Sequence, residues 1–311
     1  MSIFLGIDCG ATHLRVGLVT SEGEMISSKI TNSPLKHQPE NLARIVKDNL
    51  GGIGKIEEIG GIGIGVPGPL DMEHGLILSS SNLANVAPIN IVSQFERVFS
   101  KKVYLDRDTI VGLIGEAWQG AAVGCKDVIM LTLGTGIGGA IMEGGEIERG
   151  ADGRAGEIGH MYLSVNQIDP IDQINQKKVQ LTGTQTLRSY PISSEIPRCG
   201  LGHVNCFEAL MHSTEDLSEL GTILGYGLAN IVDIFNPEKI IIGGGMTVKG
   251  DFLTKAIEVM KQVGMKPAVD TAQVEYAKLK DMAGVMGAAR LAASESRRTK
   301  LAIDHDSHQN T

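Results

Sequence analysis

The chain has 311 residues, of which 42% are hydrophobic and 21% charged, and its formal net charge is −8. These values are typical of a globular protein with room for two domains. An acidic chain without a basic run is a poor partner for nucleic acid, and no apolar stretch reaches the roughly 20 residues of a membrane-spanning helix. The 4 cysteines are too scattered for a disulfide framework, and no charged leader or cleavage site opens the chain. We therefore expect a cytoplasmic protein without nucleic-acid or membrane partners.

Strands dominate the predicted elements of the first third of the chain. Alternating or continuous apolar runs predict strands at 3–7, 14–20, 24–30, 59–66 and 103–105. Apolar residues at helical spacing predict helices at about 42–50, 92–99 and 108–118.

The second half begins with another strand, turn and strand at 128–141. Further predicted elements are helices near 217–235, 252–263 and 282–296 and a strand at 239–242. Residues 164–198 are polar, contain prolines and show weak periodicity, so we interpret them as an insertion. The polar tail after residue 297 is expected to be disordered.

Two turns rich in glycine and threonine each follow an apolar strand. The first, Asp8–Thr12, and the second, Gly134–Gly136, combine glycines that permit a tight turn with a threonine hydroxyl donor. Such turns present backbone N–H groups to an anion, and Asp8 would hold Mg²⁺ through water. A plain hairpin turn is the alternative for the first. Two such turns, one in each half, favour two halves that close on one polyphosphate.

Two glycine patterns match the spacing of a dinucleotide-binding fingerprint, one at Gly134–Gly139 and one at Gly63–Gly68. That fingerprint requires a strand, a turn and then a helix. The first is followed by a strand, and the second contains Pro67, so we reject NAD binding at both.

The order of the motifs resembles the ROK family of sugar kinases and repressors, within the actin/hexokinase superfamily. Matching residues extend from Gly6 to about 291, and the run Arg149–His160 is highly specific for the family. The resemblance implies an α/β fold of two actin-like, ribonuclease H-like lobes with a central cleft. The small lobe would hold residues 1–106 and the C-terminal helix 283–297, the large lobe 107–282, with a disordered tail at 298–311.

The resemblance also implies the site residues. Asp108 matches the catalytic base that takes the proton of a sugar hydroxyl as that oxygen attacks the γ-phosphate of MgATP. An aspartate at that place is also a common helix N-cap, and both roles can hold. The implied ATP and phosphate contacts are Asp8, Gly10, Thr12, Gly134, Thr135, Gly136, Gly243 and Gly244. The implied sugar contacts are Gly68, Asn82, Arg107, Asp108, Glu157, His160 and Glu208.

A structural zinc site is implied in part. His160, Cys199 and Cys206 match three of the family's four ligands, but Leu201 occupies the position of the fourth. Closed zinc sites require four ligands, and His203, between the two cysteines, offers another donor. The alternative is a pair of reduced cysteines in a loop without metal.

The residues beside the base depart from the family, because Arg107 stands where an asparagine is usual. The Arg107–Asp108 pair resembles bacterial D-allose kinases, whereas a surface arginine turned away from the site is the ordinary alternative.

We therefore expect an ATP-dependent hexose kinase acting on a 6-hydroxyl, with D-allose or glucose as the leading sugars and a homodimer as the assembly. An N-acetylhexosamine kinase and a non-catalytic sugar sensor are the alternatives. A DNA-binding repressor is not expected, since only five residues precede Gly6.

Overall fold

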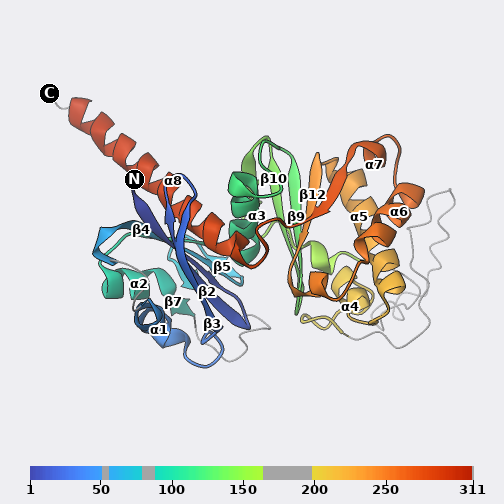
Figure 1. Ribbon diagram of the computed structural model, residues 1–311, viewed down its shortest axis with the longest axis horizontal. Helices are drawn as coiled ribbons and strands as arrows, with labels where there is room; N and C mark the ends of the chain where they lie inside the picture. Colours follow the sequence, from blue (N-terminus) through green and yellow to red (C-terminus); the bar gives the residue numbers. More distant parts are fainter. Residues whose placement is uncertain (51–55, 79–87, 164–197, 310–311) are drawn as a thin grey trace. The chain divides into compact units, whose positions relative to one another are not determined.

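The structure is a computed structural model that describes residues 1–50, 56–78, 88–163 and 198–309 (Figure 1). The chain forms two compact units, each assembled from separate segments. Unit 1 comprises Met1–Cys125, Ile147–Ala155 and Ala277–Thr311, and unit 2 comprises Lys126–Glu146 and Gly156–Tyr276.

Unit 1 is built on a five-stranded sheet of order β3-β2-β1-β4-β8. Its strands are β1 (Ile3–Cys9), β2 (His13–Thr20), β3 (Met25–Asn32), β4 (Ile59–Val66) and β8 (Val103–Arg107). The first three pair antiparallel, and β4 and β8 continue the sheet in parallel from β1. A separate small sheet contains β5 (Leu70–Asp71), β6 (Leu76–Ile77) and β7 (Ile89–Asn90).

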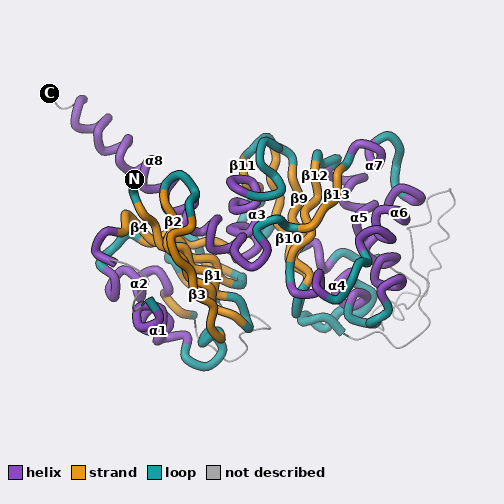
Figure 2. Tube along the Cα trace, in the orientation of Figure 1, coloured by secondary structure: helices purple, strands orange, loops and turns teal. Residues whose placement is uncertain are grey.

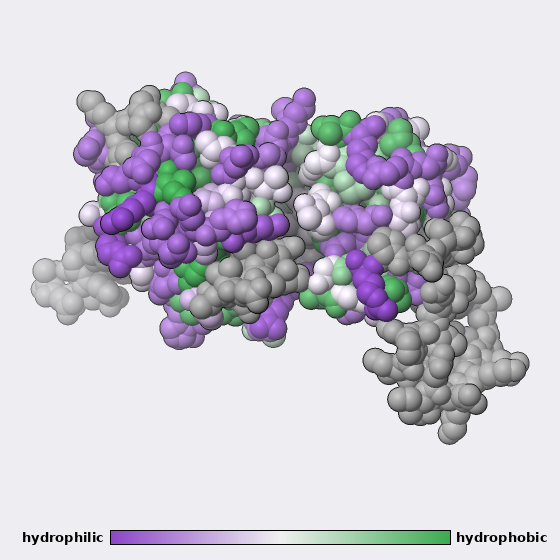
Figure 3. Space-filling model, turned by 90° about the horizontal axis from the view of Figure 1, so that it is seen from below, coloured by the Kyte–Doolittle hydropathy of each residue, from purple (hydrophilic) through white to green (hydrophobic). Residues whose placement is uncertain are grey.

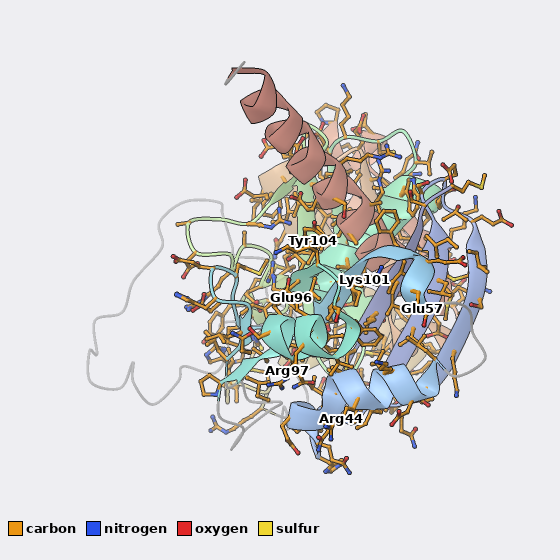
Figure 4. All side chains as sticks on the ribbon, turned by 90° about the vertical axis from the view of Figure 1, so that its left-hand side faces the viewer. Arg44, Glu57, Glu96, Arg97, Lys101 and Tyr104 are labelled. Atoms are coloured by element: carbon orange, nitrogen blue, oxygen red, sulfur yellow. The ribbon has the colours of Figure 1, made fainter. Side chains whose placement is uncertain are left out.

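Helices cover both faces of this sheet. On one face, α1 (Leu42–Asn49) and α2 (Ile91–Phe99) bury Leu42 and Phe95 in the larger core of the unit. Their outer faces carry charged residues, and Figure 4 shows Arg44 of α1 with Glu96 and Arg97 of α2 on this side of the molecule.

On the other face, α8 (Ala283–Gln309) and α3 (Asp108–Gln119) pack against each other and against the sheet. A Cβ atom at Gly6 would lie 2.1 Å from the carbonyl oxygen of Val285, and one at Gly63 would lie 1.8 Å from that of Ala288. Glycine at these two strand positions therefore lets the backbone of α8 touch the sheet directly.

Unit 2 repeats the strand order on a second sheet, β11-β10-β9-β12-β13 (Figure 2). These strands are β9 (Val128–Leu133), β10 (Ile137–Glu143), β11 (Glu146–Glu148), β12 (Lys239–Gly243) and β13 (Gln273–Tyr276). Its helices are α4 (Phe207–Met211), α5 (Leu217–Phe235), α6 (Leu253–Val263) and α7 (Ala268–Thr271). The core of the unit joins buried residues of α5 and α6 to those of β9 and β12.

The two sheets place equivalent turns at equivalent ends. The turn Gly10–Thr12 joins β1 to β2, and Gly134–Gly136 joins β9 to β10. Because β4 and β8 are parallel to β1, and β12 is parallel to β9, the carboxyl ends of these strands meet at one edge of each sheet. In open α/β sheets, ligands bind outside the carboxyl ends of the strands.

Two boundaries differ from those expected from the sequence. Residues 107–125 belong to unit 1, whereas the sequence suggested a break after 106, because α3 packs along α8. The last helix also continues to Gln309, where the tail was expected to be disordered. The first residues of that segment include Arg298, Lys300, Leu301 and Ala302, which are good helix formers. The expected insertion at 164–198 lies outside the described residues except for Arg198.

Across the described ranges, no helix combines the length and the apolar run needed to cross a bilayer. On the face seen in Figure 3, apolar residues form small groups separated by hydrophilic ones.

Candidate functional site

Asp8 lies near the carboxyl end of β1 and close to charged side chains of β2 and of the segment before α8. Its cross-strand partner is Arg15, with 3.6 Å between Arg15 Nη1 and Asp8 Oδ2. The same guanidinium donates to Asp281 Oδ1 at 2.7 Å. Asp8 also lies against the first turn of α8, where a Cβ atom at Gly284 would be 2.6 Å from Asp8 Cγ. Only glycine at 284 leaves room for this carboxylate.

The ionisation of Asp8 reflects this environment. Burial is the main cause that raises the pKa of the Asp8 carboxyl from 3.8 to about 7, and the charge of Asp108 adds to the rise. Arg15 opposes the shift but does not cancel it. Asp8 and Asp108 are a suitable donor pair for a hard divalent cation, because a positive charge offsets the repulsion between two carboxylates and Mg²⁺ prefers oxygen ligands.

Asp108 is the first residue of α3, directly after β8. Its Oδ1 accepts the N–H of Thr109 at 2.8 Å, which orients the carboxylate at the helix N-terminus. The helix is held close to β4, since a Cβ atom at Gly65 would lie 2.3 Å from Val111 Cγ2. The side chain is half-buried, so it combines fixed geometry with access to a ligand.

Arg107 is buried, with 7% of its surface exposed, so it is not the surface arginine that the sequence left open. Its guanidinium donates from Nη2 to the carbonyl oxygen of Ala155. Its stem lies over Gly68, where a Cβ atom would be 3.3 Å from Arg107 Cδ. A direct contact of Arg107 with sugar stays a prediction.

A second link joins the same strand end to the same segment. Asp106, 2% exposed, accepts the N–H of Arg107 at 2.9 Å and pairs with Arg149 at 2.5 Å between Oδ2 and Nη2. Together, the Asp106–Arg149 and Arg107–Ala155 links hold both ends of residues 149–155 to the end of β8. The sequence analysis missed both links, although Arg149 stood in its most specific motif.

In unit 2, the second turn is braced by a carboxylate. The N–H of Gly134 donates to the carbonyl of Gly136 at 2.9 Å, and the N–H of Ile137 donates to Glu208 Oε2 at 2.8 Å. Gly244, with φ of +92°, follows β12 beside this turn, because a Cβ atom there would lie 2.4 Å from the carbonyl oxygen of Leu133. Gly243 and Gly244 therefore lie next to the end of β9, as the parallel pairing requires.

Glu157 and His160 lie on a short loop that packs against β10. Glu157 precedes the 3-10 helix Ile158–His160. A Cβ atom at Gly156 would lie 2.6 Å from the carbonyl oxygen of Gly139, and one at Gly159 would lie 2.2 Å from that of Ile137. The two glycines explain the Gly-Glu-Ile-Gly-His pattern, since they let the loop backbone rest on the strand.

Four possible metal donors meet beside this loop. The donor atoms of His160, Cys199, His203 and Cys206 all lie within 4.8 Å of one another. The Nδ1 atoms of both histidines are buried and have no hydrogen-bond partner among the described residues. Leu201, in contrast, is 57% exposed. Two cysteines with two histidines are a common tetrahedral zinc set, so the four residues fit a structural zinc ion.

Asn82, the remaining implied sugar contact, lies outside the described residues. The sequence analysis also missed Gly284 and Asp281 beside Asp8. A glycine in the first turn of a helix costs roughly 1 kcal/mol relative to alanine, and this cost was the available signal for Gly284. Nothing in the local sequence indicated Asp281.

Comparisons with known proteins find similar sequences and similar folds. A model of the ROK family matches residues 4–214 and 211–295. A glucokinase from Halalkalibacterium halodurans is 28% identical, over 91% of this chain and 93% of that protein. A xylose repressor from Caldicellulosiruptor bescii is 30% identical, over 94% of this chain and 78% of that protein.

Among solved structures, a ROK family glucokinase from Streptomyces griseus in complex with glucose and AMPPNP superposes with a TM-score of 0.74. It is 23% identical and covers 94% of this chain and 100% of its own. The likeness shows the α/β fold with two actin-like units that the sequence predicted. Together, the relatives support the expected class of enzyme, a sugar phosphotransferase.

Proposed function

This chain belongs to the ROK family, and on that premise we propose that it is an ATP-dependent hexose kinase. It transfers the γ-phosphate of MgATP to the 6-hydroxyl of a hexose. The observation that carries the proposal is the pair of interacting carboxylates, Asp8 and Asp108, at the carboxyl edge of the sheet in unit 1. D-Allose and glucose are the proposed sugars, and N-acetylhexosamines are the alternative substrates. The glucokinase relative supports glucose.

Asp108 acts as the general base in this proposal. Phosphoryl transfer depends on positioning and charge stabilisation, so one fixed carboxylate and a cation suffice. The bond from Thr109 N–H to Asp108 Oδ1 supports the role, because it leaves the carboxylate little rotational freedom. Asp8 would hold Mg²⁺, and a positive charge there would favour the ionised form of a carboxyl whose pKa is raised first by burial and then by the charge of Asp108. When bound, Mg²⁺ neutralises charge that develops on the phosphates.

Phosphate binding is assigned to the two turns and to the end of β12. The assigned residues are Gly10, Thr12, Gly134, Thr135, Gly136, Gly243 and Gly244. Sugar binding is assigned to Glu157, His160, Glu208, Arg107, Gly68 and Asn82. Carboxylates and imidazole suit vicinal hydroxyls, and the rigid loop that carries Glu157 and His160 supports this assignment.

We also propose that His160, Cys199, His203 and Cys206 hold a structural zinc ion. The two buried histidine nitrogens without partners support it, because a buried polar atom left unsatisfied is costly. Elemental analysis of protein purified without chelators should find about one zinc per chain. Cys206→Ser should lose it, whereas Cys125→Ser, outside the cluster, should retain it. Retention of zinc in Cys206→Ser would overturn the ligand set.

ADP release coupled to sugar addition tests the kinase proposal. The panel contains allose, glucose, mannose, fructose, N-acetylglucosamine and N-acetylmannosamine. Asp108→Asn keeps the size of the side chain but removes the base, so turnover should fall by about 10²- to 10⁴-fold with sugar binding retained.

Asp216→Asn is the matched control, because Asp216 also accepts a backbone N–H at a helix start, at 2.9 Å from Glu219, but belongs to α5. Its turnover should be unchanged. Unchanged turnover in Asp108→Asn would refute the assignment of the base.

A sugar sensor is the second candidate, favoured by the 30% identity to a xylose repressor. A sensor would bind sugar without releasing ADP on any member of the panel. Light scattering would test the homodimer expected from the family.

A further inference from the structure

The carboxylate of Glu208 lies between two loops that the proposed function treats separately. Its Oε2 accepts the N–H of Ile137, at the end of the phosphate turn, at 2.8 Å. Its Oε1 accepts the N–H of Gly200, next to the metal donor Cys199, at 3.1 Å. One side chain therefore joins the phosphate turn, Gly134–Gly136, to the cysteine loop, Cys199–Cys206.

The packing around Glu208 leaves it little freedom. The residue is 7% exposed, and a Cβ atom at Gly136 would lie 2.8 Å from its Oε2. It belongs to the first turn of α4, directly after Cys206 and Phe207. The start of that helix is bonded to the segment that carries His160, since the N–H of Phe207 donates to the carbonyl of Met161 at 2.8 Å. Hydrogen bonds to a charged acceptor are also stronger than those between neutral groups.

We propose that Glu208 is a positioning residue that couples the metal cluster to the phosphate turn, so that zinc binding strengthens nucleotide binding. This inference rests on the proposed zinc site and the proposed phosphate turn. Zinc held by Cys199 and Cys206 fixes the Gly200 N–H on one side and the start of α4 on the other. Both constraints hold the carboxylate against the Ile137 N–H and thereby hold the shape of the turn.

Without zinc, the cysteine loop loses its anchor and the bond from Gly200 weakens. The carboxylate then moves more freely, so its bond to the Ile137 N–H holds the shape of the phosphate turn less well. Its negative charge, no longer fixed by both backbone donors, can also approach and repel the bound phosphate. Nucleotide affinity falls for both reasons. Because such coupling is reciprocal, the nucleotide must raise the affinity for zinc by the same factor.

This role is distinct from the sugar contact that the family implies for Glu208. Each carboxylate oxygen can accept a second hydrogen bond, so a sugar hydroxyl and the two backbone donors are compatible. A residue that only touched sugar would leave zinc and nucleotide binding unchanged in the absence of sugar. The coupling role predicts that both change.

Glu208→Gln tests the proposal without sugar present. The amide keeps the size of the side chain, but its NH₂ end cannot accept a hydrogen bond, so one of the two loops loses its acceptor. Zinc affinity is measured by competition with a chromophoric chelator, and affinity for a non-hydrolysable ATP analogue by calorimetry. Both should weaken about tenfold or more, since residues that support metal ligands typically contribute 10- to 100-fold to affinity.

Glu238→Gln is the matched control. Glu238 also accepts two backbone N–H groups in unit 2, those of Lys126 at 2.6 Å and Asp127 at 3.1 Å, but at the start of β9. It should bind zinc and the analogue as the wild type does. In the wild type, removal of zinc should weaken binding of the ATP analogue. This dependence on zinc should be absent or reduced in Glu208→Gln.

The outcomes separate the coupling from the kinase assignment. If the wild type shows the coupling but phosphorylates no sugar, the proposed kinase function fails and the inference stands. If Glu208→Gln changes the affinity for zinc alone, for nucleotide alone or for sugar alone, the inference is overturned. A wild type that binds no zinc would also overturn it. If Glu208→Gln does not fold, Glu208→Asp, which keeps the charge on a shorter stem, must weaken both affinities for the inference to hold.

Discussion

Replacement of Asp8 by asparagine should make the stability of unit 1 less dependent on pH. In the folded chain, the pKa of Asp8 is raised from 3.8 to about 7, first by burial and then by the charge of Asp108. A raised pKa means that the folded state holds a proton that the unfolded state has lost. Its contribution to stability is therefore complete below pH 3.8 and is lost as the pH rises towards 7.

The size of the effect follows from the shift. Each pH unit between the two pKa values costs about 1.4 kcal/mol of unfolding free energy. From pH 5 to pH 7, the wild type should therefore lose roughly 2 kcal/mol relative to Asp8→Asn, because Asp8 is itself half ionised at pH 7, and little more by pH 8. The side chain of Asp8 is only 15% exposed, so solvent screening reduces this figure little.

Fluorescence of Trp118 gives a local assay. Trp118 is the single tryptophan of the chain and lies in α3 of unit 1. The Cζ atom of Arg290, in α8, lies 5.1 Å from the centre of its ring. Urea unfolding at pH 5, 6, 7 and 8, without Mg²⁺, should show curves that diverge in favour of Asp8→Asn as the pH rises. Asp108→Asn, which removes the neighbouring charge but leaves the burial, should remove part of the slope. Parallel curves for Asp8→Asn and the wild type would refute the reasoning.

Three further substitutions test the packing and the buried charges. Gly284→Ala should destabilise unit 1 and weaken Mg²⁺-dependent nucleotide binding, because its Cβ would lie 2.6 Å from Asp8 Cγ. Gly245→Ala is its control, because a Cβ atom there would have no other atom within 4 Å. Equal losses of stability in the two variants would contradict the steric argument. Arg149→Gln should lower stability by about 2 kcal/mol in urea unfolding, since Asp106 is buried and would lose its charged partner. Glu116→Gln should cost about 1–3 kcal/mol, because its fully buried carboxylate accepts N–H groups from Ala121, Lys278 and Leu279, and an unchanged midpoint would count against that role.

Most strands and helices could be predicted because they carry their own periodicity. The runs at 59–66 and 217–235 coincide with β4 and α5 as the structure has them. The strand β13 and the short strands β5, β6 and β7 have four residues or fewer, which is too short for a period to appear. The place of α3 in unit 1 depends on its contact with α8, more than 160 residues away along the chain. A Cβ atom at Gly115 of α3 would lie 2.2 Å from the carbonyl oxygen of Ala283 of α8, which shows how closely the two helices pack.

The candidate site was predictable where a motif names a residue and less so where a contact decides its role. The sequence named Asp8 and Asp108 as candidates, and these roles stay predictions. It also named His203 as a further donor, and the structure gathers His203 with the other three donors. It left Arg107 between a sugar contact and an exposed side chain. The structure has it buried against Gly68 and bonded to Ala155, which no local pattern indicates because the partner is 48 residues away.

Asp8 and Glu208 show why residue type alone does not assign chemistry. Each is an acidic residue close to a glycine turn between two strands, one in each unit. Asp8 is partly buried and interacts with a second carboxylate, and its raised pKa means that ionisation there favours a cation as partner. Glu208 has backbone N–H donors on both oxygens, so its charge is stabilised by the chain itself. The first arrangement suits a residue that binds a metal ion with the nucleotide, and the second suits a residue that holds two loops in place. The difference lies in neighbours that only the folded chain brings together.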